Sequence, residues 1–144
     1  MRILAVDPGE KRLGIAISDP TGTIANPLTV INHISRPLDA AQVASLAIEH
    51  GVELILVGAT TDDEGNLTPQ GRSANRLAIA IRSQAQMPVI LWDETGSTQA
   101  ARQASIVMGI SSQKRRRHSH GHLDEIAATY ILQSYLDTLH PDIG

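Results

Sequence analysis

Four acidic residues lie at the ends of apolar segments, a position that suggests a function for their carboxylates. Asp7 follows the apolar run ILAV and precedes a Pro-Gly turn, Asp93 and Glu94 follow VILW, and Asp124 opens an apolar-striped segment near the C-terminus. If the first two runs are parallel strands, their carboxyl ends lie on one edge of a sheet, which is where ligands bind in open α/β sheets. We therefore expect these carboxylates to converge.

Converging carboxylates repel one another, and the repulsion raises some of their pKa values unless a cation lies between them. Oxygen ligands select Mg²⁺ or Mn²⁺, and two such ions about 3.5–4 Å apart can hold the attacking and leaving oxygens of a phosphodiester displacement. The pattern therefore predicts metal-assisted hydrolysis by a metal-activated water. Each acid also has a simpler explanation: Asp7 as a turn former, Asp93 and Glu94 as solvated loop residues, and Asp124 as a favourable charge at a helix N-terminus.

The elements that must position these acids follow from hydrophobic periodicity. Short apolar runs predict strands, and 3.6-residue spacing predicts helices. Three strands come first and helices then alternate with strands, which predicts a mixed sheet with an antiparallel and a parallel part, covered by helices. The expected strands are 2–7, 13–18, 26–31, 52–58 and 88–92, and the expected helices are 38–51, 72–86, 99–109 and 122–137.

Composition limits the function classes. The 144 residues, 42% hydrophobic with 2% aromatic and no Cys, are typical of one globular domain spanning 1–144, without disulfides or thiolate metal sites. No apolar run approaches the roughly 18 residues of a membrane span, so we expect a cytoplasmic protein with no membrane contact. The net charge of −3 does not by itself indicate nucleic-acid binding.

A third of the Lys and Arg residues nevertheless gather in one run, Lys114, Arg115, Arg116 and Arg117. The run lies between two expected helices, in a loop near Asp124, and predicts phosphate contacts that would each add roughly 0.9 to the salt dependence of duplex binding. A solvated charged loop is the alternative. His118, His120 and His122 follow in alternation; solvation or helix capping is the simpler interpretation, with zinc binding or proton transfer near the scissile phosphate as alternatives.

Several segments together resemble the YqgF family. They are ILAVDPGEKRLGIAISDPTGTIANPLTVI, LILVG, PVILWDETGST, KRRRH and LDEIAATYILQSYLD, in this order and over nearly the whole chain. Members of that family are described as nucleases for the 5′ end of pre-16S ribosomal RNA and as Holliday junction resolvase-like nucleases. The resemblance implies an RNase H-like fold whose five-stranded mixed sheet has three antiparallel strands first and two parallel strands after them, flanked by helices.

Carried over by position, the resemblance assigns catalysis and metal binding to Asp7, Glu94 and Asp124, with Asp93 as a secondary ligand. Mg²⁺ or Mn²⁺ is the expected cofactor, and nucleic-acid contacts are expected at Lys11, Arg12 and the basic run. Two positions depart from the family pattern. Thr95 replaces an Arg that usually follows the Asp-Glu pair, and Gly58–Thr60 replaces a Gly-Leu-Pro. Neither change removes an expected metal ligand.

The expected activity is that of a metal-dependent endonuclease, a hydrolase of ribosome biogenesis acting on structured RNA. Branched DNA is the alternative substrate. With few aromatics for base stacking the sequence encodes no base readout, so the resemblance alone places RNA first. A noncatalytic nucleic-acid-binding module is a second alternative, which Thr95 permits. An actin-like or sugar-kinase-like ATPase also opens with an Asp-x-Gly turn, but it needs two such domains. The oligomeric state, monomer or homodimer, stays open.

Overall fold

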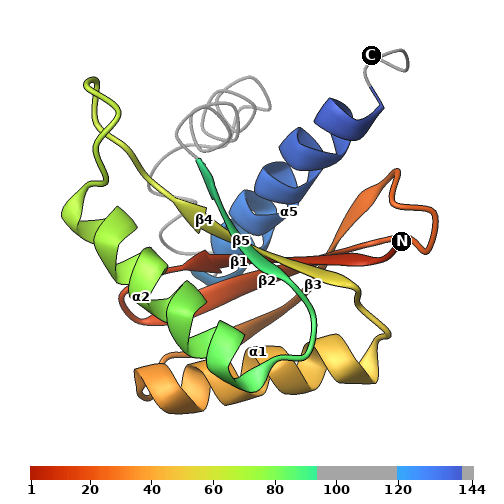
Figure 1. Cartoon of the computed structure of the whole chain (residues 1–144), viewed down its shortest axis with the longest axis horizontal. Helices are drawn as coiled ribbons and strands as arrows, with labels where there is room; N and C mark the ends of the chain where they lie inside the picture. The colour runs from red at the N-terminus through yellow and green to blue at the C-terminus, as the bar shows by residue number, and fades with distance from the viewer. Residues whose placement is uncertain (94–119, 141–144) are drawn as a thin grey trace.

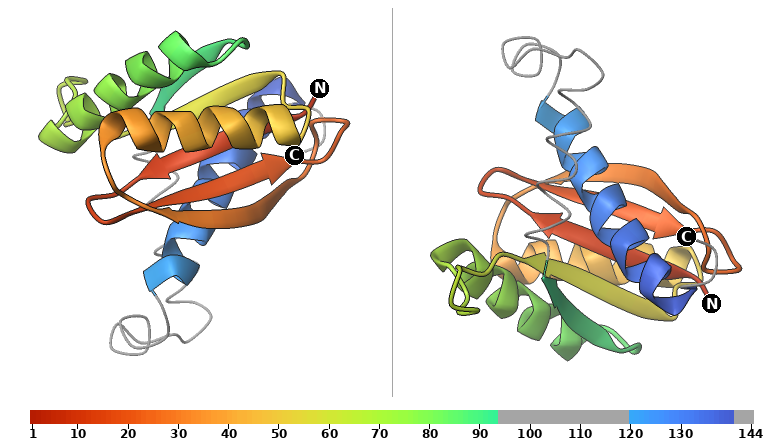
Figure 2. Two further views of the ribbon diagram at one scale, coloured as in Figure 1. Left: turned by 90° about the horizontal axis from the view of Figure 1, so that it is seen from below. Right: turned by 90° about the horizontal axis from the view of Figure 1, so that it is seen from above.

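The computed structural model describes residues 1–93 and 120–140. A five-stranded mixed sheet forms the middle layer; α1 and α2 cover one face and α5 crosses the other (Figures 1 and 2). In chain order, the described elements are β1 (Ile3–Pro8), β2 (Arg12–Ser18), β3 (Ala25–Asn32), α1 (Arg36–Glu49), β4 (Leu54–Ala59), α2 (Pro69–Gln84), β5 (Val89–Asp93) and α5 (His120–Leu139).

The sheet has the order β3-β2-β1-β4-β5. The first three strands pair antiparallel, whereas β4 pairs parallel with β1 on one side and with β5 on the other. The mixed sheet predicted from the sequence is confirmed. Because β1, β4 and β5 run in the same direction, their carboxyl ends lie on one edge, which is the arrangement that the placement of the acids requires.

Each face of the sheet has its own apolar core, because successive strand side chains point to opposite faces. In β1, Leu4 and Val6 belong to the core beneath α1 and α2, whereas Ile3 and Ala5 belong to the core beneath α5. Burial on both faces explains why this strand is a continuous apolar run. On the α5 side, the helix contributes four fully buried residues, Ala128, Ile131, Leu132 and Leu136.

Helices α1 and α2 begin earlier than the apolar pattern predicts. The Ser35 hydroxyl caps α1 by accepting from the Leu38 N–H at 3.4 Å, and the Thr68 hydroxyl caps α2 by accepting from the Gly71 N–H at 3.0 Å. Each cap is followed by a proline in the first turn, where a missing N–H costs nothing. The polar first turns therefore belong to the helices, although they carry no apolar stripe.

Helix α5 begins at His120, two residues before the predicted start. Asp124 is therefore in its second turn, and the prediction of a first-turn position is wrong. His120 lies within the helix rather than in the loop expected before it, and His122 lies within the helix as expected. The predicted helix at 99–109 lies outside the described residues. Within the ranges 1–93 and 120–140, the helices are too short or too polar to cross a membrane.

The β2–β3 loop fixes the C-terminal half of α5 to the sheet. The Asp19 carboxylate accepts from the N–H groups of Ile24 at 2.9 Å and Thr23 at 2.8 Å, and also contacts the Thr21 hydroxyl. These bonds, that of Ile24 first, hold the pKa of Asp19 well below its ordinary value. Gln133 of α5 donates to the Thr23 carbonyl of the same loop at 3.2 Å, so α5 is tied to the edge opposite the candidate site.

Candidate active site

Two of the predicted acids lie on the same edge of the sheet. Asp7 is the second-last residue of β1, and Asp93 is the last residue of β5. The two strands are separated by β4 and run parallel to it, with Val6 opposite Val57 and Asp93 opposite Ala59. The prediction that β1 and β5 bring their terminal acids to one edge is confirmed.

Asp7 faces the α5 layer. Its neighbour Val6 lies in the core beneath α1 and α2, and Ala5, two residues before it, lies in the core beneath α5. Strand alternation therefore directs the Asp7 side chain to the α5 side. The residue is half-buried, so its carboxylate stands where the core beneath α5 meets the edge of the sheet.

The strands beside Asp7 carry glycine at its level. On β2, Asp7 pairs with Gly14. On β4, the pairing of Val6 with Val57 makes Gly58 the next residue along, and both glycines are buried. Neither places a side chain next to the carboxylate. A glycine within a strand often marks close approach of a ligand or of another part of the backbone.

Asp93 lies on the other face. Its register partner Ala59 belongs to the core beneath α1 and α2, whereas the preceding Trp92 packs on the α5 side. The Thr61 hydroxyl donates to the Asp93 carboxylate at 3.2 Å. Asp93 thus shares an edge with Asp7 but not a face, and the expectation that it converges with Asp7 is wrong because the register directs its side chain to the opposite side.

Asp124 is carried by the helix that covers the Asp7 face. α5 packs against β1, β2 and β3 and crosses the sheet diagonally (Figure 2). The backbone position of Asp124, one turn before the buried Ala128, is thus on the layer that Asp7 faces. The structure describes side chains over 1–93 and 126–140, so the contacts of Asp124 stay a prediction.

Glu94 and the basic run Lys114–Arg117 lie outside the described residues, as do Thr95 and His118. Their roles stay predictions. Over the side chains that are described, no three His, Asp or Glu residues gather closely enough to hold a metal ion. Asp7 is therefore the one expected catalytic ligand whose side chain the structure places.

The turn after Asp7 carries the two remaining predicted contacts, Lys11 and Arg12. Its shape is tight: the Gly9 N–H donates to the Arg12 carbonyl at 2.9 Å, and a Cβ on Gly9 would lie 2.6 Å from that oxygen. Lys11 is exposed and Arg12, the first residue of β2, is half-buried. Two cationic residues thus follow the acid closely on its own sheet edge.

Sequence reasoning missed two features of this region. The position of glycines on both sides of Asp7 follows from strand register, which the sequence does not give. The polar contact between His33 and Asp39, at the corner between β3 and α1, had no signal in the apolar pattern, although an acid in the first turn of a helix is a common stabilising charge.

Residues 1–138 match the family model described as "RuvX: Holliday junction resolvase". A Clostridium novyi protein named "Putative pre-16S rRNA nuclease" is 34% identical over 139 residues, which cover 96% of this chain and 100% of that protein. A protein of the same name from Thermoanaerobacter pseudethanolicus is 37% identical over 138 residues, which cover 96% of this chain and 97% of that protein.

Two solved structures share the fold. Thermus thermophilus RuvC in complex with a Holliday junction substrate has a TM-score of 0.61 at 19% identity, covering 98% of this chain and 96% of that chain. The fowlpox virus Holliday junction resolvase has a TM-score of 0.57 at 17% identity, covering 96% of this chain and 99% of that chain. At this identity the likeness establishes the fold, the RNase H-like arrangement that the sequence resemblance implied.

Proposed function

The chain belongs to the RuvX family, the YqgF family of the sequence resemblance, and from this we propose that it is a metal-dependent endonuclease that hydrolyses phosphodiester bonds of nucleic acid. The observation that carries the proposal is the placement of Asp7. The residue ends a buried strand at the edge of the sheet where parallel strands terminate, half-buried on the α5 face and flanked by glycines. Carboxylate oxygens are the ligands that hard cations such as Mg²⁺ take in proteins.

We assign Mg²⁺ or Mn²⁺ binding and catalysis to Asp7, Glu94 and Asp124. The donor set fits these ions because it consists of carboxylate oxygens, and the strand neighbour of Asp7 on β2 is a glycine, which adds no side chain of its own. Bound divalent ions would supply the charge that stabilises the attacked phosphate and would activate water, in two-metal fashion. The chain's own part is to hold the carboxylates ionised and oriented. Asp93 stays at most a supporting residue, because its side chain is directed to the other face.

Cations beside this site would hold the substrate. Lys11 and Arg12 follow Asp7 within the same turn, and the run Lys114–Arg117 precedes Asp124 in sequence. We propose that these side chains neutralise backbone phosphates, so that binding weakens steeply with salt. Contacts to phosphates position a nucleic acid without reading its sequence, and the substrate would then be chosen by its shape.

Structured RNA is the proposed substrate, specifically the 5′ end of pre-16S rRNA during ribosome biogenesis. The support is the name shared by full-length relatives at 34% and 37% identity. A branched DNA junction is the second candidate, because the matching family model is described as a Holliday junction resolvase. A noncatalytic binding module is the third, since Thr95 replaces the Arg expected after Glu94. Either nucleic-acid role fits one domain spanning 1–144 in the cytoplasm, with a monomer sufficient for single cuts and a homodimer suited to paired cuts.

A cleavage assay on two substrates tests the proposal. Purified protein is incubated with a pre-16S RNA 5′ fragment and with a four-way DNA junction, each in Mg²⁺, Mn²⁺ or EDTA. We expect cutting of the RNA with either metal and none in EDTA. Cutting of the junction alone would support the resolvase function instead. Binding of nucleic acid equally well in metal and EDTA, with no cutting, would contradict the nuclease and favour the noncatalytic module.

A further inference from the structure

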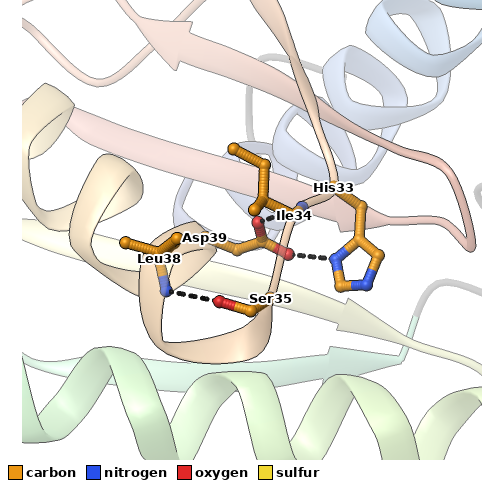
Figure 3. A network of polar contacts seen from close by, with 5 residues as sticks. All are labelled: His33, Ile34, Ser35, Leu38 and Asp39. Atoms are coloured by element: carbon orange, nitrogen blue, oxygen red, sulfur yellow. Dashed lines mark hydrogen bonds and ion pairs between the residues drawn. The ribbon is translucent and has the colours of Figure 1, made fainter.

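A carboxylate is buried where α1 begins, on the face of the sheet opposite to that of Asp7. Asp39 is only 2% exposed. One of its oxygens accepts from the Ile34 N–H at 3.0 Å, and the other contacts Nδ1 of His33 (Figure 3). Removing a carboxylate from water costs several kcal/mol unless its oxygens are hydrogen-bonded. The position therefore depends on both partners.

These bonds do not serve to cap the helix. The Ser35 hydroxyl already caps α1 by accepting from the Leu38 N–H at 3.4 Å, and the N–H of Asp39 itself donates to the Ser35 carbonyl at 2.8 Å. Both carboxylate oxygens instead bind residues that precede the cap, as Figure 3 shows. Asp39 thus fixes the corner between β3 and α1.

The corner in turn holds the turn that follows Asp7. The His33 N–H donates to the Lys11 carbonyl at 2.9 Å, one step beyond the last pair of the β2–β3 ladder, Arg12 with Asn32. The bond between Gly9 and Arg12 gives the turn a fixed internal shape. Movement of the corner is therefore transmitted to the turn as a whole.

Among the residues that the structure describes, two cavities border the turn on the α1/α2 side. Pro8, Gly9 and Glu10 line a cavity of about 520 Å³ together with His33 and Asp39. The same three residues line a second cavity of about 680 Å³ beside the start of α2. Within the described ranges the turn borders open space on this side, so the backbone bonds at its ends contribute to holding its position.

We propose that Asp39 is a positioning residue for nucleic-acid binding, acting through His33 on the turn that presents Lys11 and Arg12. The inference rests on the proposed function, because it needs Lys11 to contact a phosphate. It assigns no chemistry to His33 or Asp39. Their effect is on the affinity for substrate and not on the rate of the bound complex.

A double-mutant cycle on binding tests the connection. Dissociation constants for the RNA fragment and the DNA junction are measured in EDTA for the wild type, Asp39→Ala, Lys11→Ala and the double variant. One lost phosphate contact removes roughly 0.9 from the salt slope, which is about eightfold in affinity at 0.1 M salt. We expect each single variant to show this loss and the double variant to show no more than either.

Three further variants separate positioning from loss of stability. Ser35→Ala weakens the same helix start but leaves the corner intact, so its affinity should match that of the wild type. Asp39→Asn can still accept from Ile34 and donate to the other tautomer of His33, so it should restore affinity. His33→Ala removes the ring that Asp39 binds and should weaken binding as Asp39→Ala does, which keeps the test open if the buried truncation does not fold.

The outcomes distinguish the two proposals. The positioning role would be overturned if the double variant lost about 64-fold in affinity, the product of the two single losses. It would also be overturned if Asp39→Ala and His33→Ala bound nucleic acid as well as the wild type. Neither result would contradict the proposed nuclease. A wild type that binds neither nucleic acid would overturn the proposed function and the positioning role with it. With metal present, Asp39→Ala should raise KM and leave kcat within about twofold; a lowered kcat at unchanged KM would also contradict the inference.

Discussion

Substitution of Gly9 by alanine should distort the turn that joins Asp7 to the proposed phosphate contacts. An added Cβ would lie 2.6 Å from the Arg12 carbonyl oxygen, which is backbone and cannot rotate away. Even close carbon–oxygen contacts rarely fall below about 3.3 Å. Relief therefore requires a shift of roughly 0.7 Å, at the expense of the hydrogen bond between Gly9 and Arg12.

The size of the effect follows from this overlap. Overpacking that forces a backbone shift costs about 1–3 kcal/mol. For a chain of 144 residues, a loss of 1 kcal/mol lowers Tm by roughly 3–4 °C, so we expect a fall of about 3 to 12 °C. Affinity for nucleic acid should also fall, by about the eightfold of one phosphate contact, because Lys11 moves with the turn.

Thermal unfolding and binding in EDTA measure both effects, with Gly51→Ala as the matched control. Gly51 has φ +65° and no atom within 4 Å of an added Cβ, so its substitution costs only the backbone strain of about 1–2 kcal/mol. The control should lose stability but not affinity. A Gly9→Ala protein with the Tm and the affinity of the wild type would refute the account of the turn.

Two further predictions concern the framework. Leu132→Ala, which empties a fully buried position beneath α5, should reduce the free energy of unfolding by about 2–5 kcal/mol in urea titrations; a loss below 1 kcal/mol would contradict the packing of α5 on the sheet. The folded-state pKa of Asp19 is lowered from 3.8, so its stabilising contribution is present above about pH 4 and is lost as the pH falls further. Asp19→Asn should therefore make Tm less dependent on pH below 4. A pH profile of Tm equal to that of the wild type would show that the loop bonds do not form.

The strand content and the position of Asp7 could be predicted because they depend on local patterns. Apolar runs bounded by turns identify β1 and β5, and parallel pairing places their ends together. The face of each acid could not be predicted. A difference of one residue in register decides whether a side chain points to α5 or to α2. The register of β5 directs Asp93 to the α1/α2 face, opposite to the face of Asp7.

The helix boundaries were missed for a related reason. Apolar periodicity identifies the buried stripes of α1 and α2. It does not identify their polar first turns, which the side chains of Ser35 and Thr68 cap. These caps, each followed within two residues by proline, were readable signals of a helix start. The contact of Asp39 with His33 joins a helix to the end of a strand. The spacing of apolar residues gives no information on such a contact, so it could not be predicted.

Metal-dependent cleavage by Asp7→Asn and Asp93→Asn, measured side by side, tests the central claim most directly. Both substitutions remove one charge from the same sheet edge with little change in shape, and circular dichroism checks that both variants are folded. Because Asp7 faces the α5 layer and Asp93 faces away from it, we predict that Asp7→Asn nearly abolishes cleavage in Mn²⁺ and that Asp93→Asn retains most of it. Wild-type rates in Asp7→Asn, or equal losses in both variants, would contradict the assigned site.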